Sequence, residues 1–99
     1  MNPILINTQI QMMAAQASLL GKATSEHWDT SLYFQGKAKG LNEGINASAA
    51  VMYAARNKAQ DEAARLRAEG GDSLAYQFVA GVAAGAVEAL ALYELSEQV

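Results

Sequence analysis

The side chains with the clearest potential for chemistry lie between residues 26 and 29. Glu26, His27 and Asp29 offer one imidazole and two carboxylates, which are ligands for divalent metal ions. Their spacing of i, i+1 and i+3 does not bring all three to one face of a helix, and the patterns HExxH and paired ExxH are absent. We therefore expect solvated polar residues at the start of a helix, and no metal site.

Glu88 is the second candidate, because it is the only charged residue in the apolar stretch 74–93. A carboxyl group buried without a partner in such a stretch is a candidate proton donor. The alternative is a carboxylate that faces water or pairs with a cation on another helix, such as Arg56, Lys58 or Arg65. We expect the alternative.

The residues needed for other common catalytic sites are missing from the sequence. The chain has no cysteine and a single histidine, so most pairs of nucleophile and base cannot be assembled from it. The glycines follow no predicted strand and match neither a phosphate-binding loop nor a dinucleotide-binding pattern. The sequence predicts a non-enzymatic protein with no catalytic residues and no cofactor.

The composition limits the size and the partners of the fold. Ninety-nine residues suffice for one domain, residues 1–99, and 21 of them are alanine, which favours helix but buries little area. The net charge of −3 argues against non-specific binding of nucleic acid. The absence of a secretory signal predicts a cytoplasmic protein, and Gln77 and Glu88 argue against a membrane span at 74–93.

Apolar periodicity predicts three helical segments, at about 4–20, 25–69 and 73–97. A break in the second segment near 36–40 is left open. The pair Gly70-Gly71 marks the clearest boundary, and Asp72 or Ser73 can cap the last helix. The expected fold is all-α: an antiparallel helical hairpin or three-helix bundle, completed by homodimerisation.

Small residues recur every fourth position in two ribbons. The first comprises Gly36, Gly40, Gly44 and Ser48, and the second comprises Gly81, Gly85 and Ala89. Small residues at this spacing allow two helix backbones to approach closely, as in GxxxG helix pairs. The first ribbon has an alternative interpretation as a loop or kink, because glycine inside a helix is destabilising. We expect close packing at both ribbons.

The last helix is apolar on nearly every side, which is typical of a helix buried on every side. Two other helices of so short a chain can hardly cover it. We therefore expect a second copy to pack against it. The expected self-association residues are Phe78, Gly81, Val82, Gly85, Ala89 and Leu92.

Two further groups are candidate surfaces for another protein. Trp28, Tyr33 and Phe34 form an aromatic cluster beside His27, and aromatic residues are enriched at binding hot spots. The alternative is that they plug the end of the core. The second group consists of three cations, Arg56, Arg65 and Arg67, at the charged end of the second helix.

These features predict a small protein–protein interaction module that associates with itself and binds an unidentified protein. Its short, acidic, alanine-rich character is similar to that of many phage and mobile-element accessory proteins, some of which inhibit host or defence proteins. This similarity is one of size and composition and involves no motif. Two alternatives stay open: a nucleic-acid-associated regulator with a basic strip on the second helix, and a structural subunit of a filament or membrane-associated assembly.

Overall fold

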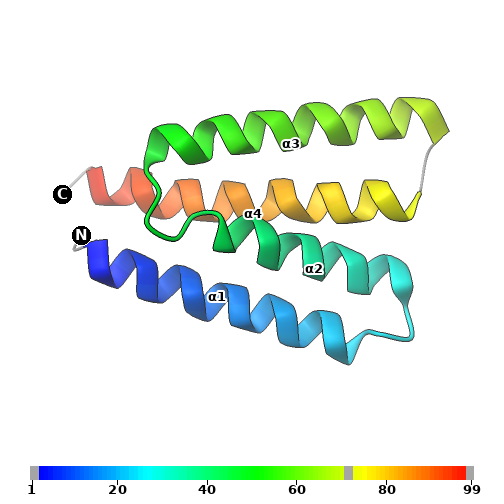
Figure 1. Ribbon diagram of the computed structural model, residues 1–99, viewed down its shortest axis with the longest axis horizontal. Coiled ribbons are helices and arrows are strands. Elements are labelled where there is room, and N and C mark those ends of the chain that lie inside the picture. Colours follow the sequence, from blue (N-terminus) through cyan, green and yellow to red (C-terminus); the bar gives the residue numbers. More distant parts are fainter. Residues whose placement is uncertain (1–2, 71–72, 98–99) are drawn as a thin grey trace.

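The chain folds into four helices joined by short connections, as the computed structural model shows for residues 3–70 and 73–97 (Figure 1). The helices are α1 (Pro3–Ala23), α2 (Trp28–Asn42), α3 (Ala49–Gly70) and α4 (Leu74–Glu97). No strand occurs in these residues. The prediction of an all-α helical bundle is confirmed, with four helices where the sequence predicted three segments.

The second predicted segment is divided between α2 and α3. It begins at Trp28 instead of residue 25, and it breaks at 43–48 instead of near 36–40. Gly36 and Gly40 remain helical, whereas Asn46 adopts a positive φ of 57°. Asparagine is one of the few residues other than glycine that tolerate this left-handed conformation, so the chain reverses there.

Long-range hydrogen bonds hold the α2–α3 connection in place. The Asn7 side chain of α1 donates to Asn46 Oδ1 at 2.7 Å and accepts from the Asn46 backbone N–H at 3.0 Å. From α4, the Tyr93 hydroxyl donates to the Gly44 carbonyl at 2.6 Å and accepts from the Ala47 N–H at 3.1 Å. The connection is therefore fixed from both sides by helices distant in the sequence.

Serine hydroxyls make hydrogen bonds at the starts of α2 and α4. Ser31 in the first turn of α2 is buried and donates to the Gly21 carbonyl at 2.7 Å, which ties the start of α2 to the end of α1. Ser73 accepts from the Tyr76 N–H at 3.1 Å and caps α4, as the sequence predicted for that residue. The other predicted cap, Asp72, lies outside the described residues.

The helices lie side by side in the order α1, α2, α4, α3, in a layer with extents of 42 × 28 × 16 Å (Figure 1). Within the described residues, the backbone of α3 runs close to that of α4 but not to that of α1 or α2. The predicted hairpin or three-helix bundle is thus an open row, with α1 and α3 at its two edges.

The core lies where α1, α2 and α4 meet the first turns of α3, next to the α2–α3 connection. Its largest fully buried side chains are Ile10, Leu41 and Met52, from α1, α2 and α3. Alanines fill the space between them, among them Ala86 and Ala89 of α4. Because these side chains are small, the helices must approach closely to exclude water.

We expect the Tyr93→Phe variant to be less stable, by about 1–2 kcal/mol, because the hydroxyl donates one hydrogen bond to the α2–α3 connection and accepts another. Urea denaturation followed by circular dichroism measures this loss. Tyr76→Phe is the matched control, because no hydrogen bond of its hydroxyl is found in the described part of the chain. Equal stabilities for the two variants would contradict the role of Tyr93.

Candidate protein-interaction surfaces

The two predicted small-residue ribbons meet each other within one chain. α2 and α4 run in the same direction (Figure 1), and Gly36 and Gly40 of α2 lie directly against the backbone of α4. A Cβ atom on Gly36 would overlap the carbonyl oxygen of Phe78, and one on Gly40 would overlap that of Val82. The interpretation of Gly36 and Gly40 as close-packing residues is confirmed.

The contact is reciprocal. A Cβ atom on Gly81 would overlap the carbonyl oxygen of Tyr33, and one on Gly85 would overlap that of Lys37 and lie 3.1 Å from the Gly40 carbonyl carbon. At the end of the ribbons, a Cβ on Gly44 would lie 2.8 Å from the Ala89 Cβ. A separation this short leaves no room for a Cβ atom at these positions on either helix.

Part of the predicted self-association face of α4 packs against α2 of the same chain. Gly81, Gly85 and Ala89 are buried against α2 of their own chain, and Leu92 packs against the core. Phe78 and Val82 are half-buried beside α2. α2 therefore covers Gly81, Gly85 and Ala89, whereas Phe78 and Val82 also line an open groove. Small-residue spacing predicted how closely the helices approach, but not that both belong to one chain.

Glu88 forms an ion pair with Lys37 of α2 at 3.0 Å, with side-chain exposures of 35% and 25%. The prediction that Glu88 pairs with a cation on another helix is confirmed, but the partner is Lys37 of α2 and not one of the α3 cations. The reason is geometric: Glu88 lies on the side of α4 that packs on α2, whereas α3 lies on the other side. A partly exposed, paired carboxylate of this kind contributes on the order of 1 kcal/mol or less to stability.

The polar residues at 26–29 point into solvent. Glu26, His27 and Asp29 are all exposed, and no group of three histidine, aspartate or glutamate side chains in the described residues is placed to hold a metal ion. His27 stands at the N-cap position of α2 but makes no side-chain capping hydrogen bond. These residues offer no convergent site.

The predicted aromatic cluster divides in two. Tyr33 and Phe34 are half-buried and pack edge to face, with ring centroids 5.5 Å apart. Trp28 is 70% exposed at the first turn of α2, where it borders a shallow hollow that Ser25 and Leu32 also line. Trp28 therefore does not plug the core, and it stays a candidate contact for a partner.

The cations of α3 do not form one strip. Arg56 and Arg67 are 11 residues apart and share one side of the helix, whereas Lys58 and Arg65 lie near the opposite side. Arg56 lies over the Tyr53 ring at 4.2 Å, and Arg65 pairs with Glu69 at 3.2 Å. This distribution gives no continuous basic surface along α3.

A groove lies between α2 and α3 and has α4 as its floor. It has a volume of about 430 Å³ and exists because α2 and α3 both pack on α4 without touching each other. Apolar side chains form its lower part: Phe78, Val79 and Val82 from α4, with Ala55 and Ala59 from α3. Phe78 and Val82 had been predicted as contact residues, but for a second copy.

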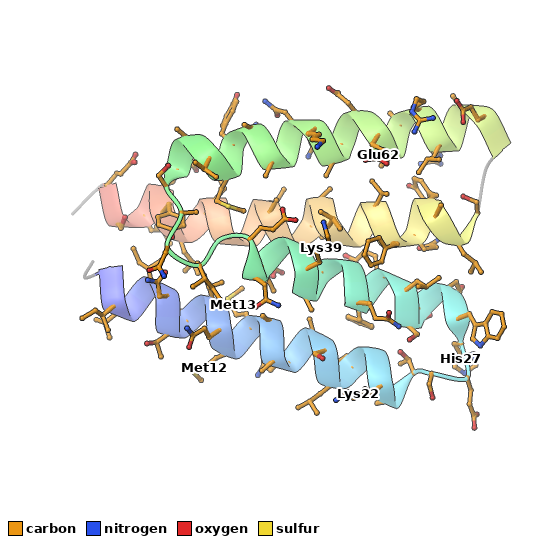
Figure 2. The ribbon with its side chains drawn as sticks, in the orientation of Figure 1. Met12, Met13, Lys22, His27, Lys39 and Glu62 are labelled. Carbon is orange, nitrogen blue, oxygen red and sulfur yellow. The ribbon has the colours of Figure 1, made fainter. Side chains whose placement is uncertain are left out.

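Charged residues form the two walls of the groove. On the α2 side Lys39 pairs with Glu43 at 2.8 Å, and on the α3 side stand Lys58 and Glu62. Because α2 and α3 run in opposite directions (Figure 1), the two walls carry lysine and glutamate in opposite order. Figure 2 labels one residue of each wall, Lys39 and Glu62. Sequence reasoning missed this groove. The shared spacing of four residues between Lys39 and Glu43 and between Lys58 and Glu62 was its only signal.

α4 also meets the length and hydropathy criteria of a membrane-spanning helix. It has 24 residues, and the mean hydropathy of its most apolar 18-residue window is 1.6. In this fold 39% of that window is buried against the other helices. One helix of this length and composition is weak evidence for a membrane span, and α4 lies between α2 and α3 in the row of helices.

Comparisons with protein-family models, curated proteins and solved structures find no match to this chain. Its surfaces are therefore interpreted from their own chemistry. The features that a partner could recognise are the α2–α3 groove, Trp28, and the exposed outer side of α1, where Leu5, Met12 and Leu19 lie.

We expect Gly40→Ala to destabilise the fold by roughly 2–3 kcal/mol, because the added methyl group must displace the α4 backbone. Gly70→Ala is the matched control, since no atom lies within 4 Å of the added Cβ at the end of α3. That control should change stability by less than about 1 kcal/mol, in the stabilising direction. Thermal and urea unfolding of both variants measures the difference, and similar effects at the two sites would refute the close contact.

Proposed function

We propose that this protein is a non-enzymatic protein–protein interaction module that receives an amphipathic helix of another protein in the groove between α2 and α3. The observation that carries the proposal is the open strip of α4 on the groove floor. Val79 and Val82 are only half-buried there, because α2 and α3 flank α4 without closing over it.

A helix is the occupant that suits this shape best. Helices in bundles pack in the grooves between their neighbours, and a further helix laid over α4 would contact α2, α3 and α4 together. Recognition of an amphipathic helix in an apolar groove is a recurrent mode of protein binding, with apolar anchors spaced at i, i+3, i+4 and i+7.

The charges of the walls specify the partner further. Each wall carries one lysine and one glutamate, so the groove has no net charge from Lys39, Glu43, Lys58 and Glu62. A complementary helix has an apolar stripe for the α4 floor and residues of both signs along its edges. Such charges at the rim contribute mainly to specificity and association rate, and apolar burial contributes most of the affinity.

The proposal is tested by quantitative capture from a lysate of the source organism with wild-type protein and four variants. Val82→Lys places a charge on the groove floor, and Val87→Lys makes the same change at an exposed valine of α4 outside the groove. Lys58→Glu reverses a wall charge, and Lys22→Glu reverses an exposed charge on α1.

We expect the recovered amount of one captured protein to fall at least tenfold with Val82→Lys. This corresponds to a loss of about 1.4 kcal/mol or more of binding free energy. The recovered amount should also fall with Lys58→Glu. With the two controls, Val87→Lys and Lys22→Glu, it should equal the amount recovered with wild-type protein. Circular dichroism establishes that each variant is folded. If no protein depends on the groove residues in this pattern, or if the controls lose binding equally, the groove is not the binding site.

A further inference from the structure

The outer side of α1 carries a row of three large apolar side chains that the rest of the fold leaves uncovered. Leu5, Met12 and Leu19 are 60%, 62% and 64% exposed, and they recur at intervals of seven residues. Figure 2 shows Met12 projecting from the outer edge of the layer, whereas Met13 points toward α2. Because α1 is an edge helix, this row forms a border of the molecule.

The row lies in an uncharged part of the chain. No lysine, arginine, aspartate or glutamate occurs from residue 3 to residue 21, although 17% of all residues are charged. Each chain carries a net charge of −3, so two copies repel each other on average. Two copies packed on the outer side of α1 would not bring like charges of this segment together.

The row is also symmetric in a way that suits a copy of itself. Leu5 and Leu19 are each seven residues from Met12, so an antiparallel copy of α1 places leucine opposite leucine and methionine opposite methionine. A two-fold interface requires this kind of self-complementarity, because the same patch serves both partners.

We infer that a second copy of this chain packs on the row, with the two α1 helices antiparallel and the two Met12 side chains on the two-fold axis. This inference goes beyond the proposed function, which concerns the groove on the other side of α2. It also moves the expected self-association from α4 to α1. The dimer extends the helical layer edge to edge and leaves both grooves open.

The area of such a contact sets the expected affinity. A strip about 30 Å long and about 15 Å wide on each copy gives roughly 900 Å² in total, near the lower limit of about 1,000 Å² for specific interfaces. A contact of this size is typical of weak, reversible association. Two open grooves in one dimer would allow it to bind a divalent partner more tightly than one copy does.

Disulfide trapping tests the geometry, because the chain has no cysteine of its own. Met12→Cys alone should form a covalent dimer on mild oxidation. Leu5→Cys should do so only when mixed with Leu19→Cys, since two copies of position 5 lie about 21 Å apart in the antiparallel pair. Efficient self-trapping of Leu5→Cys would instead indicate parallel helices and overturn the proposed arrangement.

Sedimentation equilibrium tests the association itself. Wild-type protein should approach twice the 10.5 kDa of one chain at hundreds of micromolar. Met12→Lys and Met12→Glu should each weaken association at least tenfold, and mixing them should restore a dimer. Ser18→Lys, on an exposed position of α1 outside the row, should associate as wild type does.

A wild-type protein that stays monomeric, or a Met12→Lys variant that dimerises like wild type, would overturn the inference. So would a monomer that co-sediments with vesicles of phosphatidylcholine and phosphatidylglycerol through this row, because the occupant would then be a lipid surface. The groove variant Val82→Lys should still dimerise, and Met12→Lys should still capture the groove partner. These two variants therefore distinguish a failure of the groove proposal from a failure of the dimer inference.

Discussion

The backbone contact between α2 and α4 is the constraint on which the rest of this fold depends. Gly36 and Gly40 on one helix face Gly81 and Gly85 on the other, and in each case a Cβ atom would collide with a carbonyl oxygen. The core is otherwise poor in large side chains, with Ile10, Leu41 and Met52 the largest that are fully buried among the described residues. Water is therefore excluded by the close approach of the helix backbones, and not by large side chains.

The open arrangement follows from that contact. Because α2 occupies the glycine side of α4, α3 packs on another side and α1 can reach only α2 and one end of α4. The helices consequently lie in a row, with a groove above α4 and an unpaired edge at α1. The same constraint that stabilises the chain thus also creates the two surfaces that a partner can use.

The sequence predicted local features well and long-range pairing poorly. α1, the boundary at Gly70 and the close approach of the ribbons follow from helix propensity, glycine and side-chain size. The break at 43–48 was misplaced because it depends on the Asn7–Asn46 and Tyr93 hydrogen bonds, which join residues far apart in the sequence. The groove also depends on contacts between residues far apart in the sequence. No local sequence pattern indicates that α2 and α3 both flank α4.

The most direct test of this account is nuclear magnetic resonance on an equal mixture of isotope-labelled and unlabelled chains. Nuclear Overhauser effects between the Gly40 Hα protons and the protons of Val82 and Gly85 report the contact, and isotope filtering separates effects within one chain from those between chains. We predict that they arise within one chain, at every protein concentration. Effects found only between chains would show that the glycine face of α4 joins two molecules, which would contradict the account.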